Sequence, residues 1–182
     1  LDLAVLAVPS RPASSQGRLV LDDTGHLLGI VEAVDIRQRQ VYRRLFEMVG
    51  KGSIPSSEEL LQVIKRGFAA DEHLPSEAKF ETAFGDLWRA LASEKRNLSA
   101  EDILKLIPQE KTRFEFNSAA ETKVIKTPDD IQSSRLLNTS VYLIKTSALR
   151  YALASLDRDN AQQEEYLCEV VNHLAAAIKN DK

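Results

Sequence analysis

The chain has 182 residues, of which 43% are hydrophobic and 28% charged, a composition typical of a globular domain and unlike that of a disordered chain or a disulfide scaffold. Its 24 basic and 27 acidic residues give a net charge of −3, so no basic excess indicates nucleic acid or an anionic membrane as a partner. A single cysteine, Cys168, and three scattered histidines favour neither a disulfide nor a zinc site, and we expect a reducing, cytoplasmic compartment.

The first 35 residues are predicted to form strands. Residues 1–8 are a near-continuous apolar run of the kind that fills a sheet covered on both faces, and the run is far too short to span a bilayer. Residues 18–21 and 27–33 flank the sequence Asp22-Asp23-Thr24-Gly25, which is typical of a hairpin. Because the chain begins inside a strand-like run, we expect a fragment of a longer protein.

From Ile36 the apolar spacing becomes helical for about seventy residues and predicts a small helical bundle. Ser56 with Glu59, and Ser99 with Asp102, are predicted capping boxes at two helix starts. The strongest apolar stripe consists of Phe80, Phe84, Leu87, Trp88 and Leu91. We interpret this stripe as the core of the bundle; the alternative is a partner-binding surface made by Phe80, Phe84 and Trp88.

Strand patterns return at residues 121–126 and 139–145, and helices are predicted from about Ser147 and from Gln162 to Lys179. The predicted organisation is therefore one unit made of residues 1–35 and 121–182, interrupted by a helical insertion over 36–120. We expect the strands at 3–8 and 139–145 to lie in the same sheet.

Four segments carry the candidate chemistry, and each also has a simple structural explanation. Gly17 alone indicates a turn, Glu32 a solvated strand end, and Asn160 a helix N-cap. In chain order the segments are Gln16-Gly17-Arg18-Leu19-Val20, Gly29-Ile30-Val31-Glu32, Leu137-Asn138-Thr139, and Asp159-Asn160-Ala161-Gln162-Gln163-Glu164 followed by Tyr166-Leu167.

Together with a first strand that ends at Pro9, these segments resemble the sugar nucleotidyltransferases, most closely those uridyltransferases that make UDP-N-acetylglucosamine. The resemblance covers about residues 1–35 and 130–175, under half of the chain. It implies an α/β fold in which part of a Rossmann-like, GT-A-like nucleotidyltransferase sheet carries the helical bundle as an insertion. The chain would be the C-terminal half of that nucleotidyltransferase domain.

The resemblance also implies a role for each matched residue. Gly17 would offer its backbone N–H to a sugar phosphate, Glu32 would accept hydrogen bonds from sugar hydroxyls, and Asn138 would bind a hydroxyl or the N-acetyl group. Asn160 would give its side-chain oxygen to Mg²⁺. In the reaction so implied, a sugar-1-phosphate attacks the α-phosphorus of a nucleoside triphosphate and releases pyrophosphate, with no protein nucleophile.

The chain departs from the family at several places. The Gly-rich phosphate loop of the family and its metal-binding Asp would lie upstream of Leu1, so the chain alone is expected to be inactive. Within the matched segments the departures are Gln16, Leu136, Ser140, which replaces a glycine, and Cys168-Glu169. The alternative function is therefore a degenerate, non-catalytic scaffold whose helical insertion mediates protein interaction.

Overall fold

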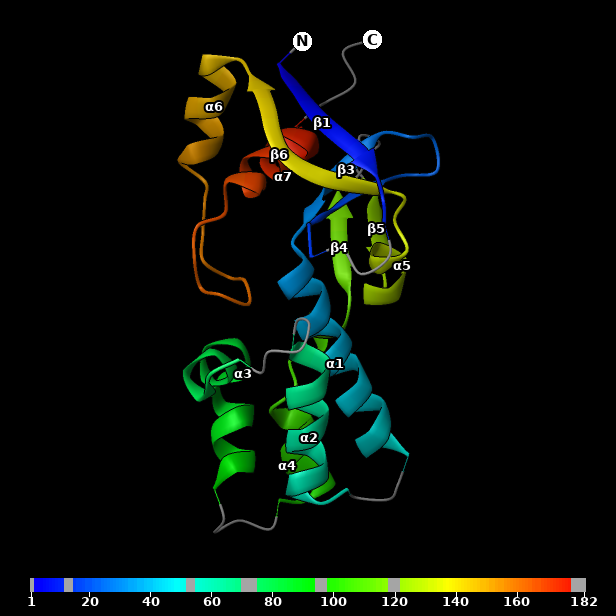
Figure 1. Cartoon of the computed structure of the whole chain (residues 1–182), viewed down its shortest axis with the longest axis vertical. Helices are drawn as coiled ribbons and strands as arrows, with labels where there is room; N and C mark the ends of the chain where they lie inside the picture. The colour runs from blue at the N-terminus through cyan, green and yellow to red at the C-terminus, as the bar shows by residue number, and fades with distance from the viewer. Residues whose placement is uncertain are drawn as a thin grey trace. The chain divides into compact units, whose positions relative to one another are not determined.

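The structure is a computed structural model of the chain, and it describes residues 2–11, 15–51, 55–69, 75–93, 98–117 and 122–177. It is a mixed α/β protein that divides into two compact units (Figure 1). The sheet unit comprises residues 1–33, 115–159 and 164–182, and the helical unit comprises 34–114 and 160–163. We had expected residues 160–163 in the sheet unit, and residues 120 and 121 at the second predicted boundary lie outside the described ranges.

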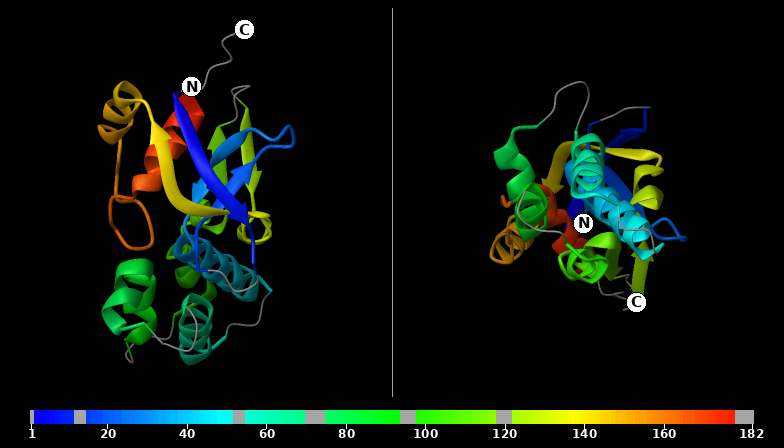
Figure 2. Two further views of the ribbon diagram at one scale, coloured as in Figure 1. Left: turned by 45° about the horizontal axis from the view of Figure 1, so that its top comes forward. Right: turned by 90° about the horizontal axis from the view of Figure 1, so that it is seen from below.

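The sheet unit contains a four-stranded sheet in the order β1 (Leu3–Pro9), β6 (Leu136–Ile144), β2 (Arg18–Leu21) and β3 (Leu27–Val31). β2 and β3 form the predicted hairpin, whose turn is closed by the Asp22 carboxylate; it accepts hydrogen bonds from the backbone N–H groups of Thr24 and His26, each 2.9 Å. β1 pairs with β6 (Figure 2), which confirms that distant parts of the chain share one sheet.

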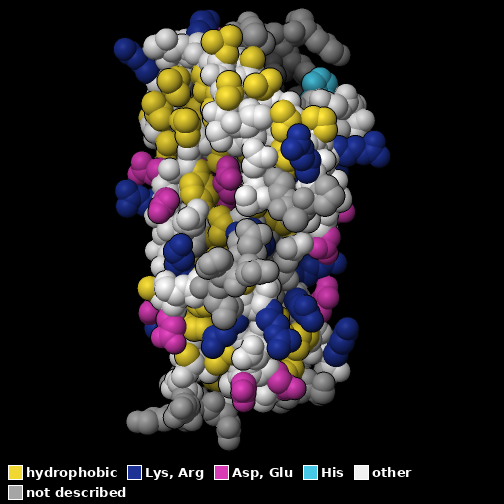
Figure 3. Space-filling model, in the orientation of Figure 1, with side chains coloured by type: hydrophobic (Ala, Val, Ile, Leu, Met, Phe, Trp, Pro, Cys, Tyr) yellow, Lys and Arg dark blue, Asp and Glu magenta, His cyan; other side chains and the backbone are white. Residues whose placement is uncertain are grey.

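The apolar run of β1 predicted a strand covered on both faces, and this prediction is wrong. It is an edge strand, and on its outer face Leu6 and Val8 are 55% and 38% exposed. Val141 and Leu143 of β6 are exposed as well, and Figure 3 shows hydrophobic side chains gathered over these two strands. A continuous apolar run does not reveal which of its two faces is covered, because both faces then carry the same residue types.

The described residues of the sheet unit also form three helices and a second, two-stranded sheet. The small sheet pairs β4 (Phe114–Asn117) with β5 (Lys123–Lys126), and the helices are α5 (Pro128–Gln132), α6 (Thr146–Leu153) and α7 (Leu167–Ala177). Neither β4 nor α5 was predicted. α7 packs against β3 and α6, and it begins at Leu167 rather than at the predicted Gln162. Every pairing in the described four-stranded sheet is antiparallel.

The helical unit consists of short amphipathic helices, as their spacing predicted. They are α1 (Ala33–Gly50), α2 (Ser57–Phe68), α3 (Glu77–Ala92) and α4 (Ala100–Lys105), followed by a 3₁₀ turn at Gln109–Thr112. Both predicted capping boxes are present. Glu59, for example, accepts a hydrogen bond from the Ser56 backbone N–H at 2.7 Å while the Ser56 hydroxyl accepts one from the Glu59 N–H.

The predicted aromatic stripe of α3 is the core of the helical unit. Phe80, Phe84 and Trp88 are only 2%, 2% and 7% exposed, so the alternative of a partner-binding surface on these three residues is wrong. Phe80 stacks on Trp88 with ring centroids 4.8 Å apart, and Phe84 meets Phe68 edge-on at 5.2 Å. Gly85 allows this packing because its positive φ of 50° kinks α3 between the two aromatic turns.

Candidate functional site

Three of the predicted site residues lie in one row in the sheet unit. Gly17 directly precedes β2, Glu32 directly follows β3, and Asn138 lies in β6. The hairpin register places Gly17 beside Glu32. On its other side, the backbone N–H of Asn138 donates to the Gly17 carbonyl oxygen at 2.9 Å, and Asn138 is paired in turn with Ala7 of β1. The sheet therefore brings together residues that are widely separated in the chain.

Gly17 makes room for the carboxylate of Glu32. A Cβ on Gly17 would stand 3.0 Å from Oε2 and 3.1 Å from Oε1 of Glu32, and 3.0 Å from the Val31 carbonyl oxygen. Gly17 is buried and Glu32 is half-buried. Among the described residues, the Glu32 carboxylate has no hydrogen-bond or ion-pair partner, so both of its oxygens remain able to accept hydrogen bonds.

Asn138 is 4% exposed, and its side-chain oxygen is already in use. Oδ1 accepts hydrogen bonds from the Ser140 backbone N–H at 3.0 Å and from the Tyr142 hydroxyl at 2.9 Å. Within the described part of the chain, the Nδ2 group donates to no partner. The oxygen of Asn138 therefore has a structural role, whereas its amide protons have no partner in the described part of the chain.

Ser140 lies in a bulge of β6 where the backbone is left-handed. Between the pairs Val5–Tyr142 and Ala7–Asn138 the register shifts, so that three residues of β6 face one residue of β1. Ser140 has a φ of +59°, a conformation that costs a residue with a side chain about 1–2 kcal/mol and that glycine adopts freely. The sugar nucleotidyltransferase pattern has a glycine at this position, which is the residue that the observed backbone conformation favours.

The sequence did not single out Arg18 and Tyr142, which support the row. Arg18 is 1% exposed and donates from Nη1 to the Gln16 carbonyl oxygen at 2.5 Å, which holds the segment leading into Gly17; burial lowers the pKa of its guanidinium. Burial also raises the pKa of the Tyr142 hydroxyl. The sequence feature that could have drawn attention to Arg18 is its place directly after Gly17 in the matched segment. Because side chains alternate along a strand, however, the Arg18 side chain lies on the face of the sheet opposite to that of its neighbour Gly17.

Asn160 belongs to the helical unit rather than to the sheet unit. It is not an N-cap, because α7 begins only at Leu167. Its Oδ1 accepts a hydrogen bond from the Gln162 backbone N–H at 3.2 Å, which is an Asx turn. The next residue, Ala161, is buried in the helical core and donates from its backbone N–H to the Asp35 carboxylate at 2.7 Å.

The described residues do not form a magnesium site by themselves. Asn160 offers one side-chain oxygen, and that atom already accepts the Gln162 bond. The described ranges contain no group of three or more His, Cys, Asp or Glu side chains that could hold a metal ion. Because Mg²⁺ takes about six oxygen ligands, the predicted role of Asn160 needs ligands from the substrate phosphates and from an upstream Asp, and it stays a prediction.

The row is suited to recognition rather than to covalent chemistry. A carboxylate that accepts hydrogen bonds stands one strand away from Gly17, and an amide that donates them stands one strand away on the other side. Sugar hydroxyls both donate and accept, so they satisfy both partners at once. Gly17 between them leaves room for the Glu32 carboxylate where a side chain would otherwise stand.

Comparison of the chain with protein-family models, with curated proteins and with solved structures finds no match. Within the described ranges, the structure contains no helix that combines the length and the apolar character needed to cross a membrane.

Proposed function

We propose that the chain is the sugar-phosphate-binding half of a nucleotidyltransferase that makes a nucleotide sugar similar to UDP-N-acetylglucosamine. On this proposal its sheet is part of a larger Rossmann-like, GT-A-like sheet. The observation that carries the proposal is the row of Glu32, Gly17 and Asn138, because three residues matched to the family by sequence alone lie side by side at the ends of β3 and β2 and within β6. The positive φ of Ser140, at a family glycine position, supports it independently.

In the proposed complex, the sugar-1-phosphate lies over Gly17, with Glu32 accepting hydrogen bonds from its hydroxyls. The Nδ2 group of Asn138 donates to a hydroxyl or to the N-acetyl oxygen, while Tyr142 and Ser140 keep the amide oriented by holding its oxygen. The phosphate oxygen of the sugar then attacks the α-phosphorus of the triphosphate, and pyrophosphate leaves. Asn160 would offer a side-chain oxygen to Mg²⁺, which would supply neutralisation of phosphate charge when bound.

A degenerate scaffold is the second candidate function. The side chain at Ser140, where the family has glycine, favours it, because that residue is exposed beside the row. A scaffold would keep the fold and bind no sugar phosphate. The two candidates therefore differ in one measurable property, the affinity of the row for a sugar-1-phosphate.

Nuclear magnetic resonance titration tests the proposal. N-acetylglucosamine 1-phosphate should shift the backbone amide signals of Gly17, Glu32 and Asn138, and free inorganic phosphate at equal concentration should shift them much less. Signals that stay in place at millimolar ligand would contradict the proposal and favour the scaffold. The chain alone should release no pyrophosphate from triphosphates and hexose-1-phosphates, since a phosphate-holding loop and a metal ligand are expected elsewhere.

A further inference from the structure

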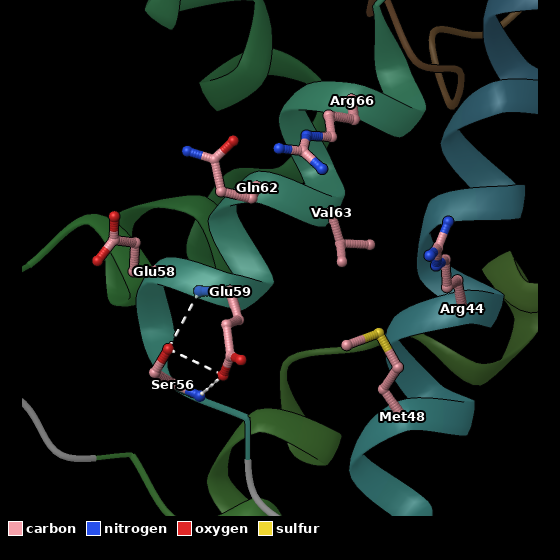
Figure 4. A pocket seen from close by; sticks show the side chains of 8 residues that line it. All are labelled: Arg44, Met48, Ser56, Glu58, Glu59, Gln62, Val63 and Arg66. Atoms are coloured by element: carbon pink, nitrogen blue, oxygen red, sulfur yellow. Dashed lines mark hydrogen bonds between the residues drawn. The ribbon is translucent and has the colours of Figure 1, made fainter.

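The helical unit carries a groove between α1 and α2 that the proposed function does not use. Its volume is about 430 Å³, within the usual range for binding sites. Arg44 and Met48 come from α1, and Glu58, Val63 and Arg66 come from α2 (Figure 4). The groove lies wholly inside one compact unit.

The two arginines of the groove carry uncompensated positive charge. Arg44 and Arg66 are exposed, and neither has an ion-pair or hydrogen-bond partner among the described residues. Two other arginines of this unit are compensated: half-buried Arg43 binds Glu47 at 3.0 Å, and exposed Arg89 binds both Glu81 and Asp86. A ligand that brings carboxylates to the groove would supply the missing partners.

The floor of the groove is apolar. Met48 and Val63 are half-buried, and their side chains extend toward each other across the space between the two helices (Figure 4). Val63 packs against the buried core of the helical unit, so the floor is rigidly supported on one side. Methionine on the other side is unbranched and adapts to irregular apolar partners.

The opposite end of the groove is acidic. Glu59 is fixed there by its hydrogen bonds to Ser56, which hold the pKa of its carboxyl below the usual value, and Glu58 stands beside it. The groove is therefore positive at one end, apolar in the middle and negative at the other. A uniformly anionic surface, such as an acidic bilayer, would meet repulsion at the Glu58 end.

We propose that this groove binds an acidic amphipathic peptide segment of a partner protein. An apolar side chain of the peptide lies between Met48 and Val63, and acidic side chains one helical turn away pair with Arg44 and Arg66. An apolar floor between two helices forms the kind of groove that accepts an amphipathic helix. Charge decides the orientation, because the acidic residues of the peptide avoid Glu58 and Glu59.

Fluorescence anisotropy with a defined probe tests this. The probe is a fluorescein-labelled helical peptide whose face carries two glutamates one turn from two leucines, and its control has lysines in place of the glutamates. The double variant Arg44→Gln/Arg66→Gln should bind the probe about tenfold more weakly than the wild-type chain, the size expected for two exposed ion pairs. The matched variant Arg43→Gln/Arg89→Gln, which removes compensated arginines, should change the affinity less than about twofold.

Trp88 fluorescence reports whether each variant keeps the folded helical core. Equal affinity of the wild-type chain for the glutamate and lysine peptides, or equal affinity of the two double variants, would overturn the proposal. Displacement of the probe by inorganic phosphate alone, at concentrations matched to the peptide, would also overturn it, since the groove would then be a simple anion site. None of these results depends on whether the sheet unit binds a sugar phosphate.

Discussion

The side-chain amide of Asn172 binds both backbone groups of Ile30. Its Oδ1 accepts from the Ile30 N–H at 2.6 Å, and its Nδ2 donates to the Ile30 carbonyl oxygen at 3.0 Å. Ile30 lies in β3, the last strand of the sheet, so these groups have no neighbouring strand to pair with. Asn172 of α7 thus makes the two hydrogen bonds that a neighbouring strand would otherwise make to Ile30. The absence of a side chain at Gly29 permits this approach, since a Cβ there would stand only 2.8 Å from Oδ1 of Asn172.

Asn172→Ala should destabilise the sheet unit by about 1–3 kcal/mol, because two backbone groups at a covered edge lose their partners. Hydrogen exchange should show lost protection at the Ile30 amide. Asn117→Ala, at the exposed end of β4, is the matched control and should leave Ile30 protected. Unchanged Ile30 exchange in Asn172→Ala would mean that the edge is covered by something other than this amide.

Ser140→Gly should stabilise the chain by roughly 1 kcal/mol, since glycine adopts the observed φ of +59° without a steric penalty. Ser140→Ala, which keeps a Cβ, should give no such gain. Urea unfolding followed by circular dichroism compares the two variants. A gain shared by alanine would show that the hydroxyl, not the backbone conformation, limits stability.

Tyr42 should make the helical unit less stable at alkaline pH. Burial, and to a lesser extent the charge of Glu110, raises the pKa of Tyr42 to about 12, whereas an unfolded tyrosine has a pKa of about 10. Between these values the unfolded chain loses a proton that the folded chain keeps, so stability falls as the pH rises from 10 to 12. The shift in the pKa of Tyr42 accounts for a loss of about 2–3 kcal/mol in the free energy of unfolding.

Denaturant titrations followed by the single tryptophan, Trp88, measure this effect in the helical unit. The difference in stability between the wild-type chain and Tyr42→Phe should be nearly constant up to pH 10 and then shift in favour of the variant. Parallel pH profiles would show that Tyr42 ionises as freely in the folded chain as in the unfolded one.

Gly17→Ala should cost about 1–3 kcal/mol, because its Cβ would press on Glu32 and on the Val31 carbonyl. In a Glu32→Ala background the cost should shrink by about 1 kcal/mol, with the clash against Val31 remaining. A double-mutant cycle on urea midpoints measures the difference. Strictly additive costs would place the Glu32 side chain away from Gly17.

Local signals in the sequence predicted much of the fold. The hairpin, both capping boxes and the helices of the helical unit follow from short-range chemistry, in which a residue such as Ser56 and its partner Glu59 are three positions apart. The edge position of β1 and its exposed face did not follow, because Leu6 and Val8 have the same residue types as a covered strand. The start of α7 was missed because Gln163, inside the predicted helix, has a positive φ of 55°, which a right-handed helix does not allow.

The candidate site was predictable as a set of residues but not as a geometry. Gly17, Glu32 and Asn138 were identified by order and spacing, and their adjacency depends on strand pairing over long sequence separations. The engagement of the Asn138 oxygen by Tyr142 could not be foreseen, because it arises from a bulge that sets the two side chains together. Asn160, matched through the same family resemblance, belongs to the other unit.

Calorimetric titration of N-acetylglucosamine 1-phosphate into three forms of the chain tests the proposed site most directly. Glu32→Ala should bind roughly 1.5–3 kcal/mol more weakly than the wild-type chain, which is about 10- to 150-fold in Kd, because it removes hydrogen bonds to a charged group. Glu165→Ala removes an exposed carboxylate that pairs with Arg158 and should bind like the wild-type chain. Equal Kd values for all three forms, or no binding by the wild-type chain, would contradict the assignment of the sheet unit to a sugar-phosphate site.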